Sequence, residues 1–237
     1  MGRYFSTAAL VLGALAASCV TAQVPGTGRI SIKPLHGYSG EPLTKPTAIV
    51  VYDFAATPEE VKLNSAMASR MRTRRRGTAD DNKNELAHKV VDNFSKSLVK
   101  DLQKTGLPVS RGIAGEPPPD NSLAVQGEFL EIDEGNRTRR MAVGLGAGAS
   151  TVQANVKCYV KQPEKNVMLT EFQATSKSSR KPGAAETAGV GAAPAVAVAA
   201  SGATEHKQSA EGDTDRMAKA VAKQITKALA AQGWVQE

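Results

Sequence analysis

The chain has 237 residues, of which 41% are hydrophobic and only 4% are aromatic. This length is sufficient for one domain with its own core, and the low aromatic share indicates a core built mainly from smaller side chains. The formal net charge of +7 is too mild to indicate a nucleic-acid partner, since a basic exported protein more often meets anionic lipid, lipopolysaccharide or peptidoglycan.

The first 22 residues have the pattern of an export signal. Arg3 is their only charge, residues 8–17 are apolar, and small residues precede the bond after Ala22. The apolar run is shorter than the roughly 20 residues that a membrane span needs. Residues 16–19 also resemble the box that directs lipid attachment to an N-terminal cysteine, here Cys19. Cleavage after Ala22 and lipidation at Cys19 are therefore alternatives, and both predict an exported protein of the periplasm or the outer membrane.

Two segments lead into the predicted sheet. Residues 23–47 are rich in Gly and Pro, so we expect a flexible arm with one short strand at Arg29–Lys33. The run Ala48–Tyr52 is continuously apolar, as in a strand covered on both faces, and is predicted to be the central strand. It ends at Asp53 and Phe54.

A polar insertion, residues 58–81, follows this strand and contains a dense arginine cluster. Such a cluster could hold the phosphate groups of lipid or nucleic acid. No aromatic residues are interleaved with it and no nucleic-acid module surrounds it, so a solvated loop near an anionic membrane surface is the favoured interpretation. The arginines are Arg70, Arg72, Arg74, Arg75 and Arg76.

The clearest helix is predicted over Lys83–Thr105. Apolar residues recur along it at steps of four and charged residues fall on the other side, so it should cover one face of a sheet. Asn82 and Glu85 fit a capping box at its start, and Gly106 fits a left-handed residue at its end.

After this helix, a short strand is predicted at Leu107–Ser110 and a longer one at Leu123–Asp133. The apolar side of the longer strand shifts after Phe129, which indicates a bulge or a strand covered on both sides. Four carboxylates lie along this strand and the turn after it, and simple alternation would divide them between two faces. Such a division is typical of solvated surface groups and not of the paired carboxylates of a glycosidase. The four carboxylates are Glu128 and Glu134 on one face and Glu131 and Asp133 on the other.

A turn at residues 134–136 opens a stretch that combines arginines with alternating glycines. A nucleotide-binding loop is not favoured, because its glycines would directly follow a strand and open a helix, whereas a charged turn precedes these and a strand follows. We expect the glycines to leave one strand face clear for close backbone approach. The residues are Arg137, Arg139 and Arg140, a second anion-binding candidate, and Gly144, Gly146 and Gly148.

The C-terminal part is predicted to contain a hairpin, a linker and a helix. Thr151–Val160 and Val167–Thr175 alternate as paired strands, and Cys158 lies on their apolar face as a small buried hydrophobe. Residues 177–212 are dominated by Ala, Gly and Ser, which favours a flexible linker over a packed small-residue segment. The helix is expected over Asp215–Gln232.

The ends of this last helix carry capping signals. Asp213 or Thr214 can cap its start, and Gly233 can end it with Trp234 folded back onto the last turn. The predicted fold is therefore α+β: a single domain over residues 48–237, with one mixed or antiparallel sheet of about four to five strands covered by two main helices.

Four stretches together resemble a bacterial family. They are residues 50–55, 126–129, 132–137 and 140–150, of which the glycine run joined to the arginine turn is the most specific. On these residues most of the mature chain resembles the bacterial domain of unknown function 4410, and the arginine-rich insertion is a departure from that pattern. The motif residues to which we assign structural roles are Asp53, Phe54, Gly127, Gly135, Gly144, Gly146 and Gly148.

The resemblance implies an exported envelope protein, often a lipoprotein, with no assigned activity. It also invites comparison with small envelope domains that regulate cell-wall synthases or assemble secretion pores, although a shared fold does not fix function. No catalytic, cofactor-binding or metal-binding residues follow from it. The histidines are scattered in the sequence at His36, His88 and His206, with no spacing typical of a metal site.

The sequence thus favours a non-enzymatic interaction module of the bacterial envelope. Its expected partner is an envelope protein, a second copy of the chain or an anionic membrane surface, and no cofactor is expected. The alternative is a binder of an anionic polymer or lipid through the two arginine clusters. A cell-wall hydrolase using the strand carboxylates is the least favoured hypothesis, and nucleic acid is not an expected partner.

Overall fold

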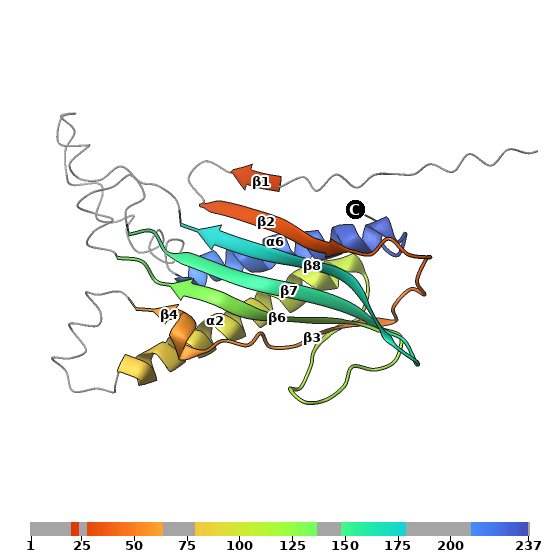
Figure 1. Ribbon diagram of the computed structural model, residues 1–237, viewed down its shortest axis with the longest axis horizontal. Coiled ribbons are helices and arrows are strands. Elements are labelled where there is room, and N and C mark those ends of the chain that lie inside the picture. The colour runs from red at the N-terminus through yellow and green to blue at the C-terminus, as the bar shows by residue number, and fades with distance from the viewer. Residues whose placement is uncertain (1–19, 24–27, 64–78, 137–147, 179–209, 237) are drawn as a thin grey trace, which may run out of the picture.

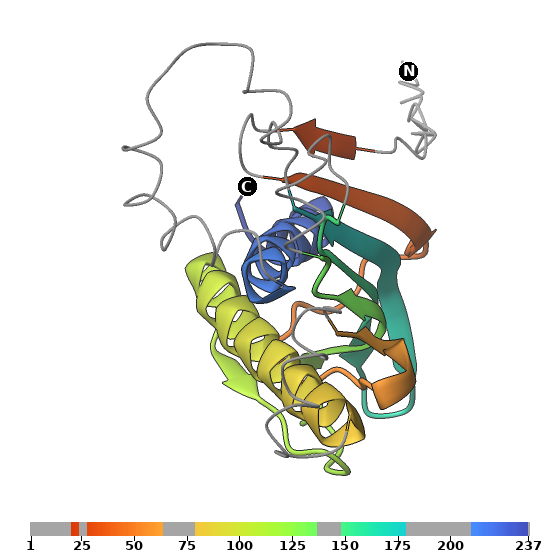
Figure 2. The same cartoon turned by 90° about the vertical axis from the view of Figure 1, so that its left-hand side faces the viewer.

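The computed structural model describes residues 20–23, 28–63, 79–136, 148–178 and 210–236. They form two layers, a mixed β-sheet and a pair of helices that cover one of its faces (Figures 1 and 2). The strands are β1 (Val20–Gln23), β2 (Arg29–Gly37), β3 (Ala48–Val51), β4 (Val61–Lys62), β5 (Val109–Arg111), β6 (Ser122–Asp133), β7 (Thr151–Lys161) and β8 (Asn166–Lys177). The helices are α2 (Ala79–Leu102) and α6 (Ala210–Ala231), with short 3₁₀ turns η1 (Pro58–Glu60) and η2 (Gln103–Thr105).

The strand order is β1-β2-β8-β7-β6-β3-β5, and β4 pairs separately with β6. Each neighbouring pair in the series β1, β2, β8, β7 and β6 is antiparallel, whereas β3 and β4 run parallel to β6 and β5 runs parallel to β3. The α+β class with one mixed sheet and two helices is therefore confirmed. The described sheet has eight strands rather than the expected four to five, because β1, β4 and β5 are short segments that pair only at its margins.

The start of the sheet differs from expectation in two ways. The short strand predicted at Arg29–Lys33 is confirmed, but it extends to Gly37 as the nine-residue strand β2 and pairs with β8, so these residues belong to the sheet and the domain begins before residue 48. Strand β3 is not central, because it lies between β6 and the edge strand β5. Its continuous apolar run is explained by burial on both faces, since Ile49, Val50 and Val51 are at most 6% exposed.

The core lies between the sheet and the two helices. The stripe predicted on α2 is buried as expected, and α6 contributes a matching stripe. Three aromatic rings meet at the centre: Phe94 of α2 lies 4.7 Å from Phe54 and 5.5 Å from Phe129 of β6, measured between ring centroids. Such tilted and edge-on contacts add to the free energy of burial. The fully buried residues of α2 are Val90, Phe94, Leu98 and Leu102, and those of α6 include Met217, Val221, Ile225 and Leu229.

Helix α2 begins earlier than its sequence signals suggest. It starts at Ala79, so Asn82 lies inside its first turn and is not the N-cap. The predicted polar insertion is accordingly shorter than residues 58–81, and its first residues form η1 and β4. The predicted end is confirmed: η2 closes at Gly106, which has the left-handed φ of 80°.

The predicted bulge and hairpin are confirmed. The register between β6 and β7 shifts between Phe129 and Glu131, so Leu130 is the extra residue and its side chain is 38% exposed. Strands β7 and β8 form the hairpin, closed by the bond that the Gln162 amide donates to the Lys165 carbonyl (2.9 Å). At the C-terminus, the Trp234 amide donates to the Leu229 carbonyl (3.1 Å) and its ring is buried, as expected for the folded-back cap.

Candidate functional site

One face of the sheet is not covered by either described helix, and we call it the open face (Figure 2). Side chains of β7 alternate strictly between fully buried positions toward the helices and half-buried positions on the open face. The strand register aligns these outer positions into two rows that cross four strands. One row is Ser31, Thr175, Gln153 and Glu131, and the other is Lys33, Gln173, Asn155 and Glu128.

The middle of the open face is held by Glu171. The Asn155 side-chain amide donates to the Glu171 carboxylate (3.1 Å), and the Lys157 ammonium lies 3.7 Å from the same oxygen. The other amide atom of Asn155, Oδ1, is buried and has no hydrogen-bond partner among the described residues. The face therefore presents amide, hydroxyl and charged groups.

Asp53, a motif residue, ties three elements together. It follows β3, and both of its carboxylate oxygens accept bonds from the Arg111 guanidinium at the end of β5 (2.6 and 2.8 Å). Ser95 of α2 donates to it as well (2.9 Å), and Arg111 also reaches Asp92 (2.8 Å). The bidentate Arg111 contact, followed by the Ser95 bond, lowers the pKa of Asp53. This residue is a structural tie between strands and helix.

Phe54 and Gly127 form the second motif contact. A Cβ atom on Gly127 would overlap both the Phe54 ring and the backbone oxygen of Asn155. Phe54 is 2% exposed and completes the aromatic group with Phe94. Glycine at position 127 thus lets the ring lie directly on strand β6.

Two further motif glycines meet at the end of β6. Gly135 has a φ of 71° and packs against the backbone of Gly148 and Ala149. Gly148 has a φ of 74° and lies in a turn before β7, so its predicted place on a strand face was wrong. A positive φ suits glycine, which has no Cβ to clash there. Gly144, Gly146 and the cluster Arg137, Arg139 and Arg140 lie outside the described residues.

Asp213 is the most buried carboxylate in the described chain, with no solvent exposure. It was expected to cap the last helix, but α6 begins at Ala210 and places it inside the first turn. Its oxygens accept bonds from the hydroxyls of Ser150 and Ser176 (3.0 Å for Ser176) and from Arg216. Burial raises the pKa of Asp213, against the opposing effects of these donors. The cluster fastens the start of α6 to strands β7 and β8.

The strand carboxylates are arranged differently from the expected alternation. Because the bulge resets the phase of β6, Glu128 and Glu131 both lie opposite the core-facing Phe129 and Ile132, on the open face. Glu131 forms an ion pair with Lys62 of β4 (2.6 Å). Among the described residues, no group of three or more His, Cys, Asp or Glu side chains could hold a metal ion.

The remaining residues singled out in the sequence are the cysteines, the histidines, Ala22 and the first arginine cluster. Cys158 is fully buried, as expected, and burial raises its pKa to about 12. His36 and His88 are exposed on β2 and α2. Ala22 lies in β1. Cys19, His206 and the cluster Arg70, Arg72, Arg74, Arg75 and Arg76 lie outside the described residues. No helix in the described ranges is long and apolar enough to cross a membrane.

Three solved structures are similar to this chain at low sequence identity. The chain is similar to the PelC dodecamer from Paraburkholderia phytofirmans, with 9% identity and a TM-score of 0.39 over 88% of this chain and 99% of that chain. It is also similar to the hypothetical protein CT253 from Chlamydia trachomatis, with 11% identity and a TM-score of 0.41 over 78% of this chain and 99% of that chain. Protein XCC0632 from Xanthomonas campestris matches with 13% identity and a TM-score of 0.36, over 84% of this chain and 94% of that chain.

A search of curated proteins finds no match. A family model described as "Domain of unknown function (DUF4410)" matches residues 49–195, a span that includes the Asp53–Arg111 tie and the Phe54–Gly127 contact. Because this match extends over more than half of the chain, the protein belongs to the DUF4410 family.

Proposed function

We propose that this protein is a non-catalytic interaction module of the bacterial envelope, and that it binds a partner protein through the open face. The observation that carries the proposal is the pair of polar rows across β2, β8, β7 and β6, on the sheet face that neither described helix covers. Hydroxyl, amide and charged side chains arranged in this way can exchange hydrogen bonds with the polar groups of a partner protein. The matching partner is a polar protein surface, with a second copy of the chain as one such surface.

The roles of the other reactive side chains support a binding function. Asp53 and Asp213 are engaged in ties between elements, and Glu131 is paired with Lys62. Cys158 is buried, so its thiol has no access to a substrate. Each of these groups has a structural explanation that requires no reaction.

The export signal supports the envelope as the compartment, and its two processing routes differ in their effect on the sheet. Cleavage after Ala22 would remove three of the four residues of β1 and free the outer edge of β2. Lipidation at Cys19 would keep all of β1 and place the anchor immediately before it. Either product retains the open face.

Site-specific photo-crosslinking in the native host tests the proposal. A photoreactive amino acid is placed at Gln153 or Gln173 on the open face and, as a control, at Asn84, which is exposed on α2. We expect a discrete crosslinked product, either an envelope protein or a dimer of the chain, from both open-face positions. The probe at Asn84 should give no such product. The proposal is wrong if the open-face probes give no product, or if all three positions give the same one.

An Asn155→Ala variant adds a specific test. It removes the side-chain amide and its bond to Glu171 while leaving the backbone ladder intact. The yield of the open-face crosslinks should then fall, whereas the unfolding midpoint of the protein should change little.

A further inference from the structure

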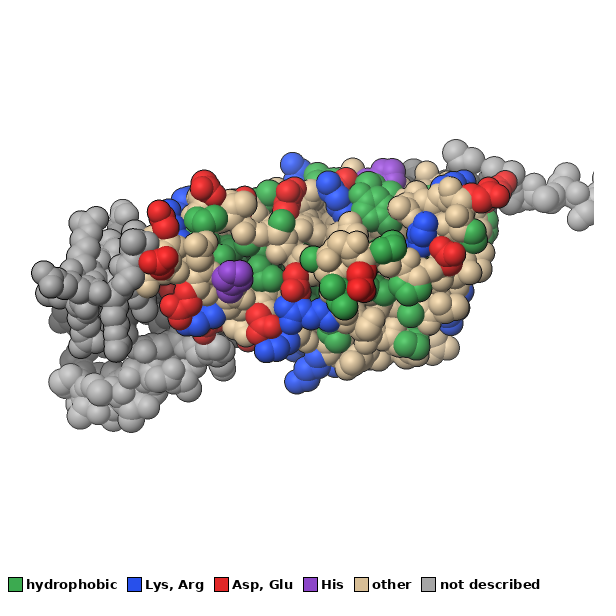
Figure 3. Space-filling view, turned by 90° about the horizontal axis from the view of Figure 1, so that it is seen from below, with side chains coloured by type: hydrophobic (Ala, Val, Ile, Leu, Met, Phe, Trp, Pro, Cys, Tyr) green, Lys and Arg blue, Asp and Glu red, His purple; other side chains and the backbone are tan. Residues whose placement is uncertain are grey.

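Acidic and basic residues are separated along helix α6, which packs beside α2. Helices α2 and α6 run side by side in the same direction, since Ser97 of α2 donates to Asp215 near the start of α6 (2.9 Å) and Asp101 lies near Lys219. Both helices have acidic residues in their first turns and lysines further along. Figure 3 shows the acidic side chains gathered toward the end at which α2 begins.

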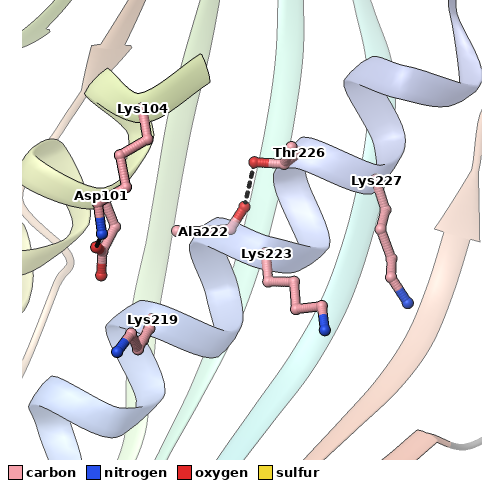
Figure 4. Close-up of a pocket in the computed structure, with 7 residues that line it drawn as sticks. All are labelled: Asp101, Lys104, Lys219, Ala222, Lys223, Thr226 and Lys227. Carbon is pink, nitrogen blue, oxygen red and sulfur yellow. Dashed lines mark hydrogen bonds and ion pairs between the residues drawn. The ribbon is translucent and has the colours of Figure 1, made fainter. Parts of the chain in front are cut away.

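Toward the other end, the helices line an open surface hollow of about 580 Å³, which we call the lysine hollow (Figure 4). Lys219, Lys223 and Lys227 are four residues apart on α6, so they follow one side of the helix over about 12 Å. Lys104, just after α2, lines the hollow from the opposite side. The one acidic residue in its lining is Asp101, which already pairs with Lys104.

The three lysines of α6 are not held by ion pairs. Among the described residues, none of them has an ion-pair partner within 4 Å. Like charges four residues apart on a helix repel one another. The helix dipole does not explain them either, because its effect is confined to the last turn and the last turn of α6 has no basic residue.

We propose that the lysine hollow binds an acidic polysaccharide. An extended polymer with a carboxylate on successive sugars can place its charges along the row of Lys219, Lys223 and Lys227. The aliphatic stems of the lysines and the methyl group of Ala222 provide an apolar floor for the C–H faces of sugars. Thr226 donates its hydroxyl to the Ala222 carbonyl (2.9 Å), which leaves the Thr226 oxygen able to accept from a sugar hydroxyl.

Two features favour a polymer over a lipid bilayer. The exposed large hydrophobic residues of the described chain are Leu35, Ile113 and Leu130, and none of them lies on α2 or α6. The helix face therefore has no apolar group to insert below lipid head groups. The site is also a hollow with a row of charges, and this shape matches a chain better than a flat surface. The lysine hollow lies in the helix layer, on the other side of the sheet from the open face.

Binding of the full-length protein to fluorescent polygalacturonate tests the inference. The triple variant Lys219→Gln, Lys223→Gln, Lys227→Gln should lose at least tenfold in affinity at low salt, and the wild-type affinity should fall steeply with added salt. The matched control is Lys62→Gln, Lys89→Gln, Lys157→Gln, which removes the same net charge at positions that do not line the hollow. It should bind within about twofold of wild type.

Further measurements distinguish polymer recognition from a general charge effect and from membrane binding. Monomeric galacturonate should bind far more weakly than the polymer, because it can reach only part of the row. Equal losses in the two triple variants would overturn the proposal, because net charge alone would then control binding. Tighter, lysine-dependent binding to vesicles containing phosphatidylglycerol would also overturn it, because the row would then recognise a membrane. All substituted lysines are surface residues, so we expect each variant to keep the wild-type unfolding midpoint. Measuring that midpoint checks that each variant is folded.

Discussion

Replacing Asp213 by Ala separates two roles for this residue. If Asp213 were an N-cap, as its sequence position suggests, the loss would be about 1 kcal/mol. The structure instead buries its carboxylate completely, against Ser150, Ser176 and Arg216. Removing one member of such a buried charged group costs about 3–5 kcal/mol.

The magnitude follows from the groups that Asp213→Ala leaves behind. Two buried hydroxyl donors, on Ser150 and Ser176, lose their acceptor, at about 1–3 kcal/mol each. The Arg216 side chain, which is 18% exposed, loses its carboxylate partner but can turn partly toward water. We therefore expect a loss of about 3–5 kcal/mol in the free energy of unfolding, which corresponds to a fall in Tm of roughly 6–20 °C.

Urea unfolding followed by circular dichroism measures this loss. The control is Asp215→Ala, two residues along α6, where the carboxylate is exposed and accepts a bond from Ser97 (2.9 Å). That change should cost less than about 1 kcal/mol, since surface polar contacts contribute little. A loss for Asp213→Ala no larger than that for Asp215→Ala would refute the role of Asp213 as the anchor of α6.

Three other predictions concern Gly127, Cys158 and Asp53. Gly127→Ala should lower the free energy of unfolding by about 1–3 kcal/mol in urea titrations, because its Cβ would overlap the Asn155 carbonyl oxygen; a neutral effect would contradict the close contact. Cys158 should resist iodoacetamide in the native protein and react only in urea, as a buried thiol with a pKa of about 12 requires. Because the pKa of Asp53 is lowered in the folded state, its stabilising contribution is present above about pH 4 and is lost as the pH falls through the folded value. Arg111→Ala should therefore lose less stability than wild type between pH 7 and pH 3, and an equal loss in both proteins would show that this contact does not set the pKa.

The features that sequence pattern predicted well are those encoded by neighbouring residues. The stripe on α2 repeats at helical spacing, and the side-chain phase of β6 changes at Leu130, where the bulge lies. The alternation of β7 and β8 likewise predicts a hairpin. In each case the burial of side chains follows directly from a local period.

The features that were missed depend on partners distant in the sequence. Strand β2 extends beyond the predicted strand at Arg29–Lys33, because its pairing with β8 continues to Gly37, and no local pattern in a Gly- and Pro-rich arm reveals that pairing. Gly212 weakens the helical signal before Asp213, so the earlier start of α6 was hidden. The spacing of Lys219 and Lys223 is visible in the sequence, but the contribution of Lys104 depends on the parallel packing of α2 and α6.

Glycine itself explains another error. Gly148 was placed on a strand because it is in phase with Val152, but a residue without a side chain carries no signal of which face it occupies. Its φ of 74° and its contact with Gly135 place it in a turn.

The measurement that tests the envelope assignment most directly is the intact mass of the mature protein from fractionated cells, with and without a block on lipoprotein processing. We predict a chain that begins either at an acylated Cys19 in the membrane fraction or at Gln23 in the periplasmic fraction. A full-length chain that begins at Met1 and is confined to the cytoplasm would contradict the account.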